Sequence, residues 1–149
     1  MFKSKPSLTE KLLKLAGRCE SAFDLCEKAD SIFQKPIQIV AYNQFRPHVQ
    51  GSVWDVGSYF LILLKPTLTP LSIQLVILHE PSHICLGHLN KPVTISELLL
   101  RFSFQTDWTH SQEQAAQKLA CKLFSVLIDA CALSPPNPPE CARFEELFR

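Results

Sequence analysis

Hydrophobic residues recur at helical spacing in the N-terminal part of the chain. Between Ser7 and Ile32, apolar side chains return every three or four positions, which predicts one or two amphipathic helices. Ser7 and Glu10 have the spacing of a capping box, so we expect the first helix to begin there. Gly17 falls inside the pattern and could break or kink it.

Three extended segments are predicted next. Residues from Ile37 to Ala41 alternate between apolar and other positions, which is typical of a strand. Asn43 to Gln50 contains proline and polar residues and is expected to be a loop. Gly51 to Asp55 and Ser58 to Leu64 complete the set, and the second of these is rich enough in Phe, Ile and Leu to be largely buried.

The second half of the chain is predicted to be helical. Thr69 can cap a helix that runs through about Leu86 and ends at Gly87. Residues 97–104 could form a short helix. A long helix capped by Thr109 or Ser111 should follow and run to about residue 131, because its apolar positions form a single stripe.

The order of these elements indicates the fold class. An N-terminal helix, a small three-stranded sheet, a helix and a further helix make a compact α+β domain. The chain has 149 residues, of which 46% are hydrophobic and 19% charged, enough for a single core. We expect one domain at residues 1–133, followed by a proline-rich spacer and a short helix at residues 134–149.

Charge and cysteine usage narrow the class of protein. The formal net charge of +1 argues against nucleic acid or an anionic membrane as the main partner. The charged N-terminus does not resemble a secretory signal, and the apolar runs are too short to span a bilayer, so we expect a cytoplasmic protein. The six cysteines form no CxxC pair and are interpreted as buried thiols, whereas a disulfide framework would need an oxidising compartment.

The stretch from Leu78 to His88 carries the most specific chemistry. His79 and His83 lie one turn apart on the predicted helix, so both imidazoles can bind one Zn²⁺. Glu80 can then act as general base on a water molecule that the metal acidifies. An open catalytic zinc site needs a third protein ligand, and Glu113, near the start of the long helix, is our candidate.

Two further histidines and one tryptophan have open roles. His88 could cap the C-terminus of its helix or line the site. His110, one turn before Glu113, could stabilise an oxyanion or be an exposed loop residue. The segment from Gly51 to Gly57 could pair with a substrate backbone, or it could form a hairpin tip with Trp54 packed on the core.

These motifs resemble those of the ImmA/IrrE-type zinc metallopeptidases. Residues 79–88 read His-Glu-x-x-His-x-x-Leu-Gly-His, similar to the HELGHxxLGH pattern of that family, and residues 113–124 resemble its later E-x-E-A-N-x-F-A-x-x-L-L pattern. The resemblance covers roughly residues 10–133 and implies a gluzincin-like α+β domain. It also implies that His79, His83 and Glu113 bind zinc, that Glu80 is the base, and that the substrate is a DNA-binding repressor of a mobile element or a stress response.

Pro81 departs from the family pattern, which usually has an aliphatic residue at that position. Within a helix, proline cannot donate to the carbonyl four residues earlier, here that of Ile77, and it costs about 3 kcal/mol, usually with a kink. Three functions therefore stay open: an active zinc endopeptidase, a catalytically impaired binding or regulatory module, and a metallohydrolase with another kind of substrate.

Replacing Pro81 by leucine tests the strain argument. Pro81→Leu restores a backbone donor, so we expect a higher melting temperature and a higher zinc content in the purified protein. Differential scanning calorimetry and elemental analysis measure these two quantities. No gain in either would contradict the argument.

Overall fold

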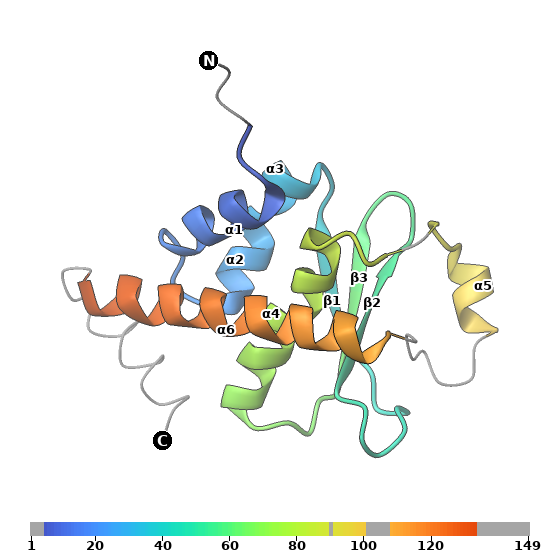
Figure 1. Ribbon diagram of the computed structural model, residues 1–149. Coiled ribbons are helices and arrows are strands. Elements are labelled where there is room, and N and C mark those ends of the chain that lie inside the picture. Colours follow the sequence, from blue (N-terminus) through green and yellow to red (C-terminus); the bar gives the residue numbers. More distant parts are fainter. Residues whose placement is uncertain (1–4, 90, 101–107, 134–149) are drawn as a thin grey trace.

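A three-stranded mixed sheet with helices on both of its sides forms the framework of the computed structural model (Figure 1), which describes residues 5–89, 91–100 and 108–133. The elements in chain order are α1 (Leu8–Ala16), α2 (Ala22–Lys28), α3 (Asp30–Phe33), β1 (Ile37–Ala41), β2 (Gly51–Asp55), β3 (Phe60–Leu64), α4 (Pro70–Cys85), α5 (Ile95–Leu99) and α6 (His110–Leu133). The predicted α+β fold is confirmed.

β3 is the central strand of the sheet, and it is buried along its whole length. It pairs in parallel with β1 and antiparallel with β2, so the strand order is β1-β3-β2 and β2 lies at an edge. Side chains of β3 alternate between the two faces, because successive residues of a strand point in opposite directions. Ile62 packs toward α4 with Val53 and Ile84, whereas Leu61 packs toward α5 with Leu98.

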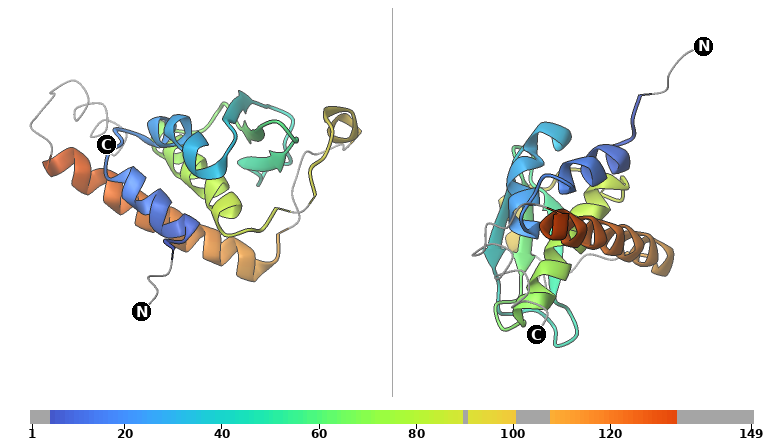
Figure 2. Two further views of the ribbon diagram at one scale, coloured as in Figure 1. Left: turned by 90° about the horizontal axis from the view of Figure 1, so that it is seen from above. Right: turned by 90° about the vertical axis from the view of Figure 1, so that its left-hand side faces the viewer.

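The larger helical layer consists of α1, α2, α4 and α6. The buried stripe of α6 packs against α1 and α4. Its members are Ala116, Leu119, Ala120, Leu123 and Leu127. Figure 2 shows α6 lying across α4 with α1 beside it. This packing carries the N-terminal end of α6 past the second half of α4, where the histidine motif lies.

The N-terminal region differs from the prediction in detail. Ser7 does cap α1, since its Oγ accepts a hydrogen bond from the Glu10 amide at 3.1 Å, and Gly17 ends that helix. Three helices, however, replace the predicted one or two. Ser21 starts α2 by accepting from Asp24, and Gln34, which adopts a positive φ of 65°, ends α3.

The cysteine prediction is partly wrong. Cys19, Cys26 and Cys85 are buried free thiols, as expected, but Cys121 is exposed. Cys121 lies outside the apolar stripe of α6, so its side chain faces away from the core. Residues 134–149 and the second half of the predicted helix 97–104 lie outside the described residues. The first half of that prediction is helical in part, since α5 ends at Leu99.

Helix α4 begins and ends as its sequence predicts. The Thr69 Oγ1 accepts from the Ser72 amide at 3.2 Å, and Gly87 follows the helix with a φ of 74°. The helix continues through Pro81 without interruption. Across the described part of the chain, no helix has both the length and the apolar character that a bilayer span requires.

Gly51 allows β2 to start close to α4. A Cβ atom at this position would lie 2.6 Å from the Val76 Cγ1 atom and 3.1 Å from the Leu63 carbonyl oxygen. Both distances are shorter than ordinary contacts, so only glycine fits without a local shift. The edge strand therefore begins directly beside the turn of α4 that carries Glu80.

Candidate metal centre

Three side chains from two distant helices meet at one point. The His79 and His83 Nε2 atoms are 3.2 Å apart, and the Glu113 Oε1 atom lies 2.9 Å from His83 Nε2 and 3.5 Å from His79 Nε2. One ligand atom from each residue falls within 4.8 Å of the other two. These residues form a possible metal-binding group, and we call them the His/His/Glu triad.

The start of α6 places Glu113. The Gln112 amide donates to Thr109 Oγ1 at 3.1 Å, and the Thr109 amide donates to Gln112 Oε1 at 3.0 Å, which makes a reciprocal cap. Thr109, rather than Ser111, is therefore the capping residue. Glu113 lies in the first turn, where the helix dipole favours a carboxylate, and its side chain is 46% exposed.

Gln117 orients His79. The His79 Nδ1 atom lies 2.9 Å from the Gln117 Oε1 atom, while the Gln117 Nε2 atom donates to the Cys121 sulfur. Because an amide oxygen only accepts, the proton of His79 resides on Nδ1. The Nε2 atom of His79 is then left with its lone pair directed at the other two members of the triad, as a metal ligand requires.

His88 makes the corresponding contact with His83. Their Nδ1 atoms are 2.8 Å apart, so one of the two rings carries the proton that they share. When His83 is the donor, its Nε2 atom is also free to bind a cation. In that tautomer three lone-pair atoms converge with no proton between them, an arrangement that a divalent cation stabilises.

Burial keeps His83 uncharged. Its side chain is fully buried and stacks on Trp108, with ring centroids 4.3 Å apart and an interplanar angle of 15°. Burial and the neighbouring histidines lower the pKa of His83 to about 3. A neutral imidazole is the form that coordinates a metal, so the surroundings of His83 suit a ligand.

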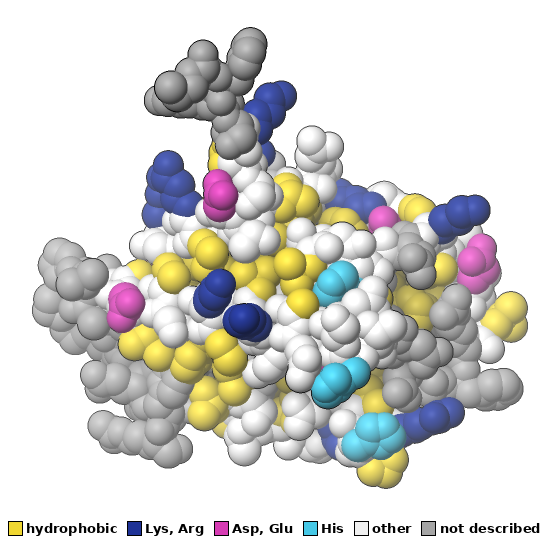
Figure 3. All heavy atoms as spheres, in the orientation of Figure 1, with side chains coloured by type: hydrophobic (Ala, Val, Ile, Leu, Met, Phe, Trp, Pro, Cys, Tyr) yellow, Lys and Arg dark blue, Asp and Glu magenta, His cyan; other side chains and the backbone are white. Residues whose placement is uncertain are grey.

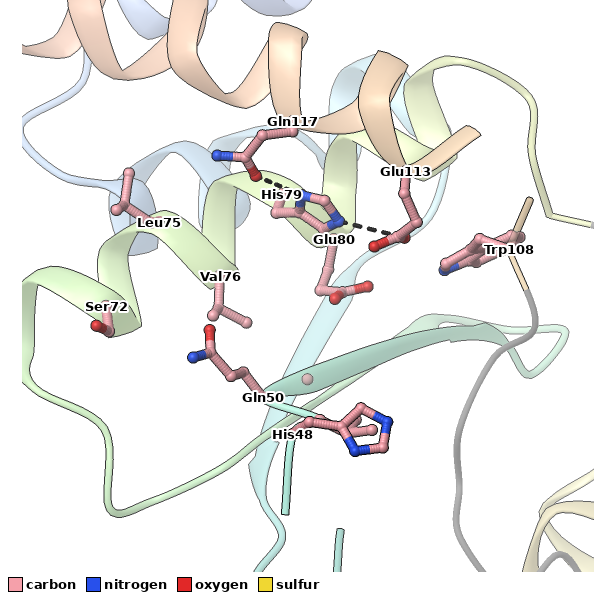
Figure 4. Close-up of a pocket in the computed structure, with 12 residues that line it drawn as sticks. His48, Gln50, Ser72, Leu75, Val76, His79, Glu80, Trp108, Glu113 and Gln117 are labelled. Atoms are coloured by element: carbon pink, nitrogen blue, oxygen red, sulfur yellow. Dashed lines mark hydrogen bonds and ion pairs between the residues drawn. The ribbon is translucent and has the colours of Figure 1, made fainter. Parts of the chain in front are cut away.

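Glu80 lines the same pocket as two members of the triad, His79 and Glu113. Burial, reinforced by the charge of Glu113, raises the pKa of Glu80 to about 8, and its Oε2 atom has no hydrogen-bond partner among the described residues. Figure 4 shows its carboxyl group below His79 and Glu113, on the side of α4 that faces the start of β2. A buried acid of this kind is available to a molecule that enters the pocket.

The pocket itself has a volume of about 480 Å³. One wall is formed by α4 and α6, and the opposite wall by the loop before β2 and the start of that strand. Its lining residues are His48, Val49, Gln50, Gly51, Ser72, Leu75, Val76, His79, Glu80, Trp108, Glu113 and Gln117. Histidine side chains reach the surface on this face near the N-terminal end of α6 (Figure 3).

The structure distinguishes between the alternative roles that the sequence left open for His88, His110 and Trp54. His88 contacts His83 but does not line the pocket. His110 is exposed and does not line the pocket either. Trp54 is buried in the sheet and donates from Nε1 to Ser52 Oγ at 3.0 Å, which agrees with the packed alternative. Gly51, at the other end of the same strand, does line the pocket.

Several residues of the site were not predicted. Gln117 lies one turn after Glu113, so helical spacing could have singled it out. His48 and Trp108 gave no comparable signal, because both lie in segments without periodicity and reach the pocket only through the fold.

Comparisons with known proteins leave the family open. No protein-family model matches the chain, and neither the curated proteins nor the solved structures give a significant match. The possible metal-binding group therefore rests on the geometry of the site.

Substituting Gln117 tests its orienting role. Gln117→Ala leaves His79 free to rotate or to change tautomer, so we expect zinc affinity to fall by about 10- to 100-fold. Competition titration with a chromophoric chelator measures this change. Gln114→Ala, at an exposed position of the same helix, is the control, and equal affinities in the two variants would refute the role.

The buried acid predicts a pH effect in metal-free protein. Folded Glu80 stays protonated to about pH 8, whereas in the unfolded chain it ionises near 4.5. Its contribution to stability is thus complete below about pH 4.5 and is lost as the pH rises toward 8.

The variant Glu80→Gln carries no ionisable group at this position, so its folding stability should not show the decrease between pH 4.5 and pH 8 that Glu80 causes in the wild type. With chelator present, we expect its stability advantage over wild type to grow by on the order of 3 kcal/mol between pH 5 and pH 8. Urea unfolding at the two pH values measures the difference. The exposed Glu27→Gln serves as control, and a pH-independent difference for Glu80→Gln would contradict the assignment.

Proposed function

We propose that the protein is a zinc-dependent endopeptidase that cleaves a protein partner. The observation that carries this proposal is the convergence of His79, His83 and Glu113 at one point. His79 and Glu113 line the same pocket as Glu80, whose Oε2 atom has no hydrogen-bond partner among the described residues. Two imidazoles, a carboxylate and a separate acid form a donor set typical of catalytic zinc sites.

In this proposal the triad holds the metal and Glu80 moves the proton. Bound zinc would supply a Lewis acid that polarises the substrate carbonyl and acidifies water. A nearby divalent charge also lowers the pKa of a carboxyl group, so Glu80 becomes able to take a proton from the attacking water. Glu80 then delivers that proton to the nitrogen of the leaving amine.

The surroundings of the pocket favour a polypeptide substrate. β2 is an edge strand, and its first residue, Gly51, lines the pocket next to Glu80. An extended peptide could add to such an edge through backbone hydrogen bonds and so bring a peptide bond to the triad. We further propose a DNA-binding repressor as the substrate, on the resemblance of residues 79–88 and 113–124 to ImmA/IrrE-type peptidases.

The continuity of α4 favours an active enzyme over an impaired module. Proline between the two histidines could have displaced one of them, yet both Nε2 atoms lie within 3.5 Å of the same Glu113 oxygen. The helix therefore accommodates Pro81 without separating the ligands.

Metal analysis combined with cleavage assays tests the function. We expect the purified protein to hold about one zinc per chain and to cut a helix-turn-helix repressor encoded beside its gene. Glu80→Gln should keep the zinc and lose cleavage by at least about 100-fold, because the proton acceptor is gone. Mass spectrometry of the products measures the cleavage.

Glu97→Gln, at an exposed position of α5, is the matched control and should cleave like the wild type. Equal cleavage by wild type and Glu80→Gln would exclude the mechanism. Stoichiometric zinc without any cleavage would instead support the non-hydrolytic module.

A further inference from the structure

Pro81 leaves a buried carbonyl group without its usual donor. In an uninterrupted helix the Ile77 oxygen would accept from the amide of residue 81, but proline has no N–H group. Ile77 is fully buried and Pro81 is buried as well, so water is a poor substitute. A buried carbonyl without a partner destabilises the folded state and favours a local opening of the helix.

The thiol of Cys26 occupies the position of a replacement donor. Its sulfur lies 3.7 Å from the Ile77 oxygen and donates to it from the neighbouring helix α2. Burial raises the pKa of Cys26 to about 12, so the thiol keeps the proton that it donates. The Cys26 thiol thus donates to the same Ile77 carbonyl that lacks a backbone donor because residue 81 is proline.

A second buried hydrogen bond sets the register of the two helices. The Ala22 amide, in the first turn of α2, donates to the Gln74 Oε1 atom of α4 at 2.9 Å. Cys26 is one turn further along α2, and Ile77 is about one turn further along α4, so the two bonds lie on the same helix–helix contact. The Gln74 bond thereby holds the Cys26 thiol opposite the Ile77 carbonyl.

We propose that Cys26 is a positioning residue for the metal centre, whose thiol replaces the missing amide donor and keeps the Pro81 turn of α4 in helical geometry. Ile77 is two residues before His79, and Pro81 is two residues before His83. A bend at this carbonyl would therefore change the angle between the two imidazoles. The proposal rests on the triad as a metal site, and it does not require that the protein be a peptidase.

A double-mutant cycle with zinc alone as the probe separates hydrogen bonding from packing. Cys26→Ala removes the thiol in both backgrounds, but in the Pro81→Leu background a backbone amide already satisfies the Ile77 carbonyl. We expect Cys26→Ala to weaken zinc binding about tenfold when Pro81 is present and less than about twofold in the Pro81→Leu background. Cys26→Val, which fills the space without a donor, should show the same dependence on background.

Chelator competition gives zinc affinity, and thermal unfolding with chelator present gives the stability of each variant. Cys19→Ala is the control, because its buried thiol donates within its own segment, to the Leu15 carbonyl at 3.2 Å. Cys19→Ala should change zinc affinity and thermal stability by the same amounts whether residue 81 is proline or leucine.

Equal losses for Cys26→Ala in the two backgrounds would overturn the proposal and leave Cys26 as a packing residue. Coupling in thermal stability without coupling in zinc affinity would also overturn it, since the thiol would then support the helix without positioning the ligands. A wild-type protein that binds no zinc would refute the metal site itself, an outcome distinct from a failure of Cys26 alone.

Discussion

The contact between α4 and α6 is the constraint on which the site depends. α4 contributes two imidazoles one turn apart, but a helix by itself offers no third ligand in the right direction. α6 supplies Glu113 only because its apolar stripe packs across α4 and fixes where its first turn lies. The same crossing brings Gln117 to His79, so one packing interaction places both a member of the triad and a residue that orients another member.

Burial sets the protonation of this site in two opposite directions. It lowers the pKa of His83 and raises that of Glu80, since in both cases a low-dielectric environment disfavours the charged form. Without a metal, both groups are therefore neutral at pH 7. A divalent ion bound at the triad would change this balance by placing a positive charge near Glu80.

Pro81 shows how tertiary contacts can compensate for an unfavourable local sequence. Helix propensity alone predicts a break or a kink at this position. In the structure, the helix continues between the central sheet and α2, and the Cys26 thiol contacts the carbonyl that the proline leaves without a donor. Local propensity describes an isolated helix, whereas the folded chain adds partners that the isolated helix does not have.

The sequence by itself determined the elements with strong local signals: the caps at Ser7 and Thr69, the three strands, and the spacing of His79 and His83. It also indicated Glu113 as a partner, through its place near the start of a predicted helix. Only the tertiary structure decided that His88 contacts His83, that His110 stays outside the pocket, and that Trp108 stacks on His83. The physical reason is that periodicity and capping act within a few residues along the chain. The direction in which a loop residue or a helix end points depends on packing between distant segments.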